Sequence, residues 1–404
     1  MIKDSFKKEG NKYIVFPEIK KFCKNNEIDL PSNRVDGLCS IESFADKNSI
    51  NAEKVNEWLE KIIKEGIKHI YISKVSFFKD KSLYKSELFW REFTNRFNIE
   101  NIFVNNDAGT NKLKYKSIKF TKINSSISVV HLYMSMLVAQ PEPDHESGDI
   151  ELYPVFIDID IEKEIVIIRI KSKSNQYKTK SGITFKQKVD FNNKITNDKI
   201  VKEIIDKLAI DIGFNRYQFD EFKDEIEFAY YSLLKEMTST PKIIEEKLEG
   251  CKGIIENTIS NLLKTLGISE QHYRDAATAD LRILLEKFTA ISYPDKDIFT
   301  ENSFAFPVKL SATDSEDTKI EESSSNYEPL QTKGAFYDHK KIIMAEEVCD
   351  GMRIAVKRLD KKYYGAEPFI AKLDYIKGFA RIRIEEYVEE EDIQNVLSRV
   401  ISYI

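Results

Sequence analysis

The sequence has few of the residues that mark a specialised class of protein. Its 404 residues include only four cysteines, ten prolines and two tryptophans. Cys23, Cys39, Cys251 and Cys349 are widely spaced and form no CxxC pair. This spacing supports neither a disulfide framework nor a zinc ribbon, so we expect reduced and mostly buried cysteines.

Long apolar stretches are also missing. No run approaches the ~18 residues that a membrane-spanning helix needs. The first ten residues, MIKDSFKKEG, have no apolar core and no cleavage pattern. We therefore expect no membrane segment, no signal peptide and a cytoplasmic location.

Recognised catalytic and phosphate-binding motifs are absent, and the sequence resembles no family that we can identify. It contains no GxxxxGK[ST], GxGxxG or HExxH pattern. None of the five histidines lies with a serine or cysteine in a recognised motif for nucleophilic catalysis, although His145 lies between Asp144 and Glu146. Asp107 follows an expected strand, where a turn explains it better than a site does. We expect no cofactor and no metal.

What is present can build sizeable cores. Hydrophobic residues make up 42% of the chain and aromatic residues 11%, which argues against disorder and, at this length, for more than one domain. The net charge of −5 argues against a protein that coats nucleic acid with its whole surface. A local basic face stays possible, because local fields depend on how the charges are distributed.

The fold class that the patterns favour is α+β, in five segments. Residues 1–125 alternate helix and strand, which predicts an α/β layer with some parallel pairing. Its expected elements are strands 13–16, 67–73 and 101–105 and helices 52–65 and 86–97. The other segments are a central β-hairpin with a basic tail at 126–190, a helical segment at 191–310, a flexible linker at 311–333, and an antiparallel meander with a closing helix at 334–404.

The central hairpin offers weak catalytic candidates. Asp158 and Asp160 share one face of the first strand, because residues two apart on a strand point the same way. Metal-dependent nucleases combine such carboxylates with an acidic-x-Lys triplet on the next strand. Here the triplet is Arg169, Ile170 and Lys171, so Arg169 replaces the acidic member. The alternative without a catalytic role is a row of carboxylates paired across the hairpin.

Two tracts that contain no acidic residue predict a nucleic-acid interface. Lysines can meet phosphates, and Tyr115, Phe120, Tyr177 and Phe185 could stack on unpaired bases. A bulge near Ser117 would keep one face of the first tract apolar. The candidate binding residues are Lys112, Lys114, Lys116, Lys119, Arg169, Lys171, Lys173, Tyr177, Lys178, Lys180, Phe185, Lys186 and Lys188. The alternative is a pair of sheet edges that lysines protect against aggregation.

The leading hypothesis is a cytosolic nucleic-acid-binding protein, an accessory in a bacterial or phage defence or replication system. The sequence leaves enzymatic activity open and leans against it. One alternative is a metal-dependent nuclease with an atypical site. The other is a non-catalytic subunit of a larger complex, with the acidic C-terminal face from Glu385 to Asp392 as its contact. In the leading hypothesis, the linker tethers a C-terminal module that docks a protein partner or a second copy.

Overall fold

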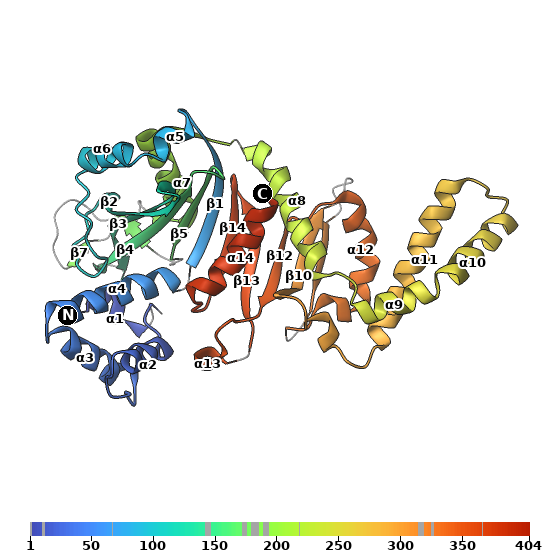
Figure 1. Ribbon diagram of the computed structural model, residues 1–404, viewed down its shortest axis with the longest axis horizontal. Helices are drawn as coiled ribbons and strands as arrows, with labels where there is room; N and C mark the ends of the chain where they lie inside the picture. The colour runs from blue at the N-terminus through green and yellow to red at the C-terminus, as the bar shows by residue number, and fades with distance from the viewer. Residues whose placement is uncertain are drawn as a thin grey trace. The chain divides into compact units, whose positions relative to one another are not determined.

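The computed structural model combines helices with antiparallel strands, which confirms the α+β class (Figure 1). It describes residues 2–9, 13–66, 68–141, 147–171, 176–178, 186–188, 194–217, 219–313, 319–324, 327–365 and 367–404. No described helix combines the length and the apolarity that crossing a membrane requires. The chain forms two compact units: unit 1 comprises Met1–Lys223, Leu359–Gly365 and Ile376–Gln394, and unit 2 comprises Asp224–Arg358, Ala366–Tyr375 and Asn395–Ile404.

Unit 1 is built on an antiparallel sheet whose strand order is β14-β1-β5-β4-β3. The far edge of β3 pairs with both β2 and β6, while β7 pairs with β4, β8 with β6 and β9 with β1. The strands are β1 (Lys68–Phe77), β2 (Lys114–Ile123), β3 (Ser126–Pro141), β4 (Ser147–Asp160), β5 (Ile165–Ile170), β6 (Gln176–Lys178), β7 (Lys186–Lys188), β8 (Lys194–Ile195), β9 (Phe214–Arg216) and β14 (Phe379–Ile384).

The expectation of parallel pairing is wrong for the described strands. β1 lies between β5 and β14, and both pairings are antiparallel. β14 is some three hundred residues away in sequence, so periodicity within the N-terminal segment cannot reveal it. The helices of this part are α1 (Asp4–Lys7), α2 (Phe16–Asn25), α3 (Arg34–Ala45), α4 (Ser49–Glu65), α5 (Lys81–Tyr84), α6 (Glu87–Phe97), α7 (Asn197–Leu208), the π-helix η3 (Ala209–Gly213) and α13 (Lys361–Tyr364).

Alternating residues of this sheet enter two cores. Ile157 and Ile159 of β4 pack with Trp90 of α6 and Ile204 of α7. Phe156, the residue before Ile157, packs on the opposite face with Leu59 of α4, as the two-residue period of a strand requires. Asp158 shares the second face. The sheet therefore presents this carboxylate toward the α4 side.

Two short strands expected near the N-terminus are not formed. Residues 13–16 lead into α2, which begins at Phe16 with Pro17 in its first turn, where proline is favoured. Residues 101–105 form a turn and loop instead of a strand, and Asn98 and Asn101 adopt left-handed backbone conformations, which asparagine tolerates better than most residues. Of the four cysteines, Cys23 and Cys349 are buried, whereas Cys39 and Cys251 are exposed.

Unit 2 has its own antiparallel strands, in the order β11-β10-β12-β13. They are β10 (Ala305–Thr313), β11 (Lys319–Ser323), β12 (Gly351–Val356) and β13 (Phe369–Ile376). The remaining helices are α8 (Phe219–Met237), α9 (Lys242–Gly250), α10 (Lys252–Thr265), α11 (Gln271–Ser292), η4 (Asp297–Phe299), η5 (Leu330–Thr332), α12 (Gly334–Glu346) and α14 (Glu390–Tyr403).

The flexible linker predicted at 311–333 is wrong for its described residues. β10 continues to Thr313, and β11 pairs with it antiparallel, with Ile320 opposite Ala312. An alternating edge strand needs only one apolar residue in two, so a serine- and glutamate-rich segment can still form one. The division of the chain into five segments stays a prediction.

A basic cleft and a charged pocket in unit 1

Two hollows in unit 1 contain most of the residues that could carry chemistry. The charged pocket, about 430 Å³, is lined by Glu57, Glu60, Lys61, Lys64, Glu65, Ser117, Lys119, His131, Leu132, Tyr133, Phe156, Asp158 and Glu390. The basic cleft, about 560 Å³, is lined by Arg96, Phe97, Asn98, Glu100, Ile102, Thr110, Lys112, Leu113, Lys114, Tyr115, Lys116 and Lys207.

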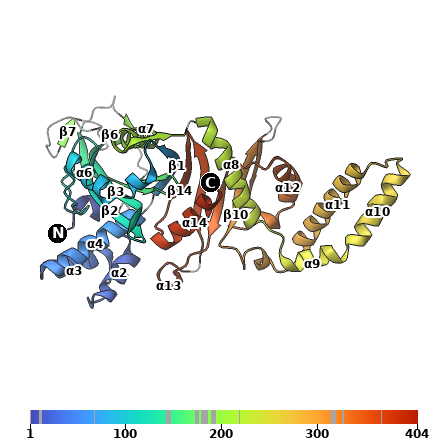
Figure 2. The same cartoon turned by 45° about the horizontal axis from the view of Figure 1, so that its top comes forward.

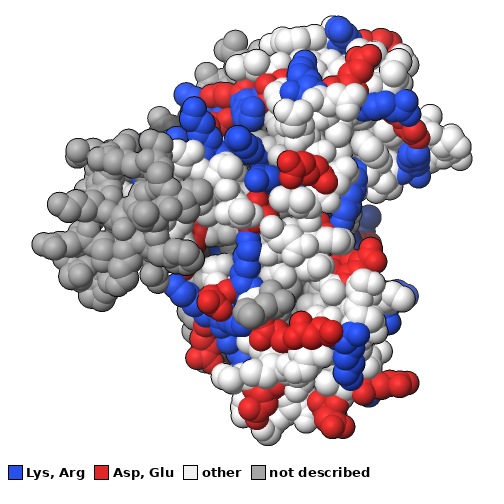
Figure 3. Space-filling model, turned by 90° about the vertical axis from the view of Figure 1, so that its left-hand side faces the viewer, with Lys and Arg blue, Asp and Glu red and all other residues white. Residues whose placement is uncertain are grey.

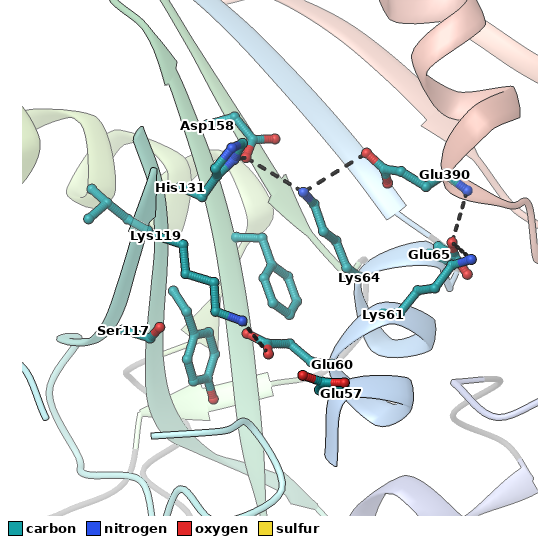
Figure 4. A pocket seen from close by; sticks show the side chains of 13 residues that line it. Glu57, Glu60, Lys61, Lys64, Glu65, Ser117, Lys119, His131, Asp158 and Glu390 are labelled. Atoms are coloured by element: carbon teal, nitrogen blue, oxygen red, sulfur yellow. Dashed lines mark hydrogen bonds and ion pairs between the residues drawn. The ribbon is translucent and has the colours of Figure 1, made fainter. Parts of the chain in front are cut away.

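Strand register and one helix assemble the charged pocket. His131 of β3 lies directly opposite Asp158 of β4, and both side chains point toward α4. Lys64, in the last turn of α4, reaches between the carboxylates of Asp158 and Glu390, at 3.6 and 3.9 Å (Figure 4). α4 begins earlier than expected, because the side chain of Asn48, not of Asn51, caps it by accepting from the Asn51 backbone N–H at 2.8 Å.

A chain of three polar groups crosses the strands at His131. Its Nδ1 lies 2.6 Å from Oδ1 of Asp158, and its Nε2 lies 2.8 Å from Oγ1 of Thr121. An ionised carboxylate only accepts hydrogen bonds, so Nδ1 carries the proton and Nε2 of a neutral ring accepts from the hydroxyl. This is the geometry in which histidine can take a proton from a hydroxyl group. Sequence reasoning missed it, because only the β2–β3 pairing brings Thr121 to His131.

Arg169 is fully buried beneath this pocket and pairs with two carboxylates. Its Nη1 and Nη2 donate to Glu390 at 2.6 and 2.9 Å, and Nη2 lies 3.4 Å from Oδ2 of Asp158. Removing one partner of such a buried pair typically costs about 3–5 kcal/mol, because a charge is left without compensation. The residue that breaks the nuclease triplet is therefore the internal counterion of Asp158.

The electrostatics of Asp158 follow from these neighbours. Burial alone would raise the pKa of this carboxyl, but Lys64, the hydrogen bond from His131 and the charge of Arg169 hold the pKa well below its usual range. Asp158 is therefore ionised at neutral pH, and it fixes the orientation of the His131 ring.

The nuclease candidates do not come together. The strand partner of Asp158 is Ile167, four residues before Lys171, or about 13 Å along the strand. Lys171 is buried, with its Nζ 3.7 Å from the centre of the Tyr13 ring. Asp160 accepts from the Lys163 backbone N–H at 3.0 Å, which closes the hairpin turn. Among the described residues, no three His, Cys, Asp or Glu side chains are arranged to hold a metal ion.

Burial perturbs two further groups beside the pocket. It raises the pKa of Glu65 to about 7, although the Tyr387 hydroxyl and the Glu390 backbone N–H donate to this carboxylate at 2.6 and 3.1 Å. It lowers the pKa of Lys68 to about 7, and the nearby charge of Arg169 adds to this effect. Perturbed groups beside a pocket are typical of functional sites, but structural ion-pair networks also produce them.

Half of the candidate binding lysines whose side chains the structure describes serve internal pairs. Lys116 binds buried Asp107 at 2.9 Å, Lys119 binds Glu60 at 2.8 Å, and Lys178 binds Glu203 at 2.8 Å. Arg169 and Lys171 are buried, as described above. Exposed pairs are weak and can exchange partners, so Lys119 and Lys178 keep some capacity to bind an anion, whereas the buried side chains do not.

The aromatic candidates are placed less favourably than the lysines. Tyr115 and Tyr177 are buried, at 5% and 8% exposure, so their rings offer no stacking face. Phe120 is half-buried against the α6 core. Lys173, Lys180 and Phe185 lie outside the described residues, and Lys186 and Lys188 lie in β7 with side chains that are not described.

The two basic tracts meet along one edge of β3. β4 occupies one side of this strand. On the other side, Lys114 of β2 lies opposite Ser135, and Lys178 of β6 lies opposite Val138, three residues or about 10 Å farther along. The expected bulge is confirmed as a register shift between Tyr115 and Ser117. The tracts thus follow each other end to end beside the basic cleft.

The basic cleft contains five cationic residues against one acidic residue, Glu100. Two of the five are neutralised: Lys116 by Asp107, and Lys207 by Asp211 at 2.7 Å. Arg96 lies over the Phe97 ring at 4.7 Å. Lys112 and Lys114 are exposed, and within the described part of the chain no ion pair or hydrogen bond engages their ammonium groups. These two lysines are the cations that remain available for an anion.

A tight turn holds the strand that carries these lysines. Asp107 is fully buried and accepts from the Gly109 backbone N–H at 2.8 Å and from the Tyr133 hydroxyl at 2.9 Å. Ser135 also donates to it. The carboxylate is fully engaged, so the turn role predicted for Asp107 is confirmed. It anchors the loop from which Lys112 and Lys114 emerge.

The charges outside the cleft show no single sign. On the described part of the face drawn in Figure 3, basic and acidic side chains are interspersed. Binding of a polyanion would therefore be local. The chain matches no protein-family model and no curated protein.

Proposed function

We propose that this protein binds nucleic acid through the basic cleft of unit 1, by contacts to the phosphate backbone. The observation that carries the proposal is the pair of exposed lysines, Lys112 and Lys114, in a cleft whose lining has five cations and one acid. Phosphates are the most abundant targets for such groups on a nucleic acid.

The neighbouring edge of β3 extends this site. Lys178 lies beyond Lys114 along β3. The odd offset of three residues directs its side chain to the other face of the sheet, where it meets Glu203 of α7. Arg96 of α6 and Lys207 of α7 also line the cleft. A single strand that passes around this edge would meet cations of β2, β6, α6 and α7.

Base recognition contributes little in this proposal. Tyr115 and Tyr177 are buried, and lysine reads bases less specifically than arginine, asparagine or glutamine. We therefore expect similar affinities for oligothymidylate and oligocytidylate, and a steep dependence on salt. The roles in defence or replication and the interaction-subunit alternative stay hypotheses that the cleft does not distinguish.

The test is a filter-binding titration with labelled oligothymidylate over a range of salt concentrations. In the Lys112→Glu/Lys114→Glu variant we expect binding at least ~10-fold weaker, and a slope of log K against log salt that is shallower by about 1.4, the loss of two phosphate contacts on a single strand. Both lysines are exposed, so the fold should be retained.

The matched control is Lys252→Glu/Lys264→Glu. These lysines are exposed on α10, and the variant makes the same change in net charge in unit 2. It should bind like the wild type at matched ionic strength. Equal losses in the two variants would show that net charge alone governs binding, and an unchanged affinity in the cleft variant would refute the site.

A further inference from the structure

One long helix of unit 2 is buried on only part of its circumference. α11 runs beside α10 (Figure 1, Figure 2), and of its residues only Glu286 and Ala290 are buried. Lys340 of α12 and Thr240 hold the Glu286 carboxylate, each at 2.7 Å. The exposed large apolar side chains of α11 are Tyr273 at 52%, Leu284 at 45%, Phe288 at 59% and Ile291 at 40%.

These four side chains form a single stripe. At 100° per residue, positions 273, 284, 288 and 291 fall within about 60° of one another around the helix axis, and Ala277 falls between them. The stripe extends over about 27 Å at 1.5 Å per residue. A continuous apolar stripe of this length on a water-facing surface marks an interaction site more often than isolated exposed residues do.

The stripe is complementary to a second copy of itself that runs in the opposite direction. When two copies of α11 are placed antiparallel about the midpoint between Arg282 and Ile283, Ala277 of one copy meets Phe288 of the other, and Leu281 meets Leu284. In the same register Tyr273 lies within one residue of the position opposite Ile291. An interface with two-fold symmetry requires this property, because each contact must occur twice with the roles exchanged.

The charged residues of α11 do not favour a partner other than a second copy of this chain. α11 carries three basic and three acidic residues, and intramolecular pairs already engage most of them. Arg282 binds Glu245 and Glu249, Lys287 binds Asp338, and Asp280 binds Lys341. The helix therefore has no excess charge that would select an oppositely charged surface.

The available area fits a reversible contact. Four side chains, each about half exposed, offer on the order of 400 Å² of apolar surface. A standard interface buries ~800 Å² per partner, so the stripe offers about half of this area and fits a weak contact that depends on concentration.

We propose that α11 is a homodimerisation helix, which pairs antiparallel with α11 of a second copy through Tyr273, Ala277, Leu281, Leu284, Phe288 and Ile291. This inference is independent of the nucleic-acid proposal, because it concerns other residues in the other compact unit.

Sedimentation velocity over a range of concentrations tests the inference. The wild type should shift reversibly from monomer to dimer as the concentration rises. Leu284→Glu/Phe288→Glu should remain monomeric at every concentration, with an unchanged far-ultraviolet circular dichroism spectrum. The matched control is Val35→Glu/Ile210→Glu, which places the same charges on exposed apolar positions of unit 1 and should dimerise like the wild type.

Disulfide trapping tests the register in a background with Cys39→Ser and Cys251→Ser. Tyr273→Cys/Ile291→Cys should form a covalent dimer on mild oxidation. Asp275→Cys/Ile291→Cys should not, because position 275 lies on the opposite side of the helix. A wild type that is monomeric throughout, or a dimer that survives Leu284→Glu/Phe288→Glu, would overturn the proposal.

Discussion

At the scale of single residues, the network around Asp158 shows how one buried cation organises several carboxylates. Arg169 joins Asp158 of β4 to Glu390 of α14, and Lys64 bridges the same two groups from α4. These charged side chains therefore hold α4 and α14, which are distant from each other in sequence, to the sheet. Because the pairs are buried, salt should weaken them less than it weakens surface pairs.

Glu65 gives this network a pH dependence. Its pKa is raised from 4.5 to about 7 in the folded state, so below the unfolded pKa it contributes its full stability, which is lost as the pH rises through about 7. The free energy of unfolding should fall by about 3 kcal/mol between these limits. In Glu65→Gln, which stays neutral, this slope should disappear.

Urea unfolding followed by tryptophan fluorescence measures this effect. Trp58 and Trp90 are the two tryptophans of the chain, and both lie in unit 1, so the signal reports this unit. Glu57→Gln is the control, since Glu57 is an exposed residue of the same helix and its loss should leave the slope in place. If the wild-type free energy of unfolding does not change between about pH 5 and pH 7, the raised pKa assigned to Glu65 is contradicted.

At the scale of elements, the turn at Gly109 positions Lys112 and the start of β2, which carries Lys114. Gly109 has a φ of +73°, and a Cβ there would lie 2.6 Å from Cδ2 of Leu137 and 2.9 Å from Cδ1 of Leu152. Gly109→Ala should lower the free energy of unfolding of unit 1 by about 1–3 kcal/mol through overpacking, beyond the cost of the left-handed backbone.

Gly213→Ala separates these two contributions. Gly213 also lies in unit 1 and has a φ of +93°, but a Cβ there would meet Phe78 and Tyr84 only at 3.5 Å. It should therefore show the backbone cost without the clash. If the two variants have equal stabilities in the fluorescence-detected urea titration, the packing around Gly109 does not constrain the loop.

Local patterns predicted individual elements well. The apolar stripe from Val55 to Ile63 identified α4, and the apolar runs of the hairpin identified β5 and the C-terminal half of β4, which begins six residues before the predicted start at Tyr153. The meander strands and the closing helix also lie where periodicity put them. Each of these signals is contained within one segment, where the burial of one face dictates the sequence.

Pairing between distant segments could not be read in this way. The parallel layer expected in the N-terminal segment is replaced by antiparallel neighbours of β1, and the hydrogen-bonded chain of Thr121, His131 and Asp158 depends on the β2–β3 register. For the candidate site, the sequence showed which residue types are present, but it did not show which of them are buried. Tyr115 and Lys112 belong to one tract, yet the first is a core residue and the second is exposed.

At the scale of the whole molecule, a net charge of −5 conceals a local basic surface. The charges outside the cleft are mixed, so long-range steering should be weak and binding should depend on direct contact with the cleft. Because a dimer formed through α11 would carry two clefts, short oligonucleotides are the better probe, since they exclude avidity.

Nucleic-acid binding in the basic cleft is tested most directly by a lysine acetylation footprint of the wild-type protein with and without a short oligothymidylate, read by mass spectrometry. We expect the oligonucleotide to protect Lys112 and Lys114, while Lys199, Lys202 and Lys252, exposed elsewhere, react equally in both states. If a complex forms and Lys112 and Lys114 react at unchanged rates, nucleic acid binds elsewhere and the basic cleft is not the interface.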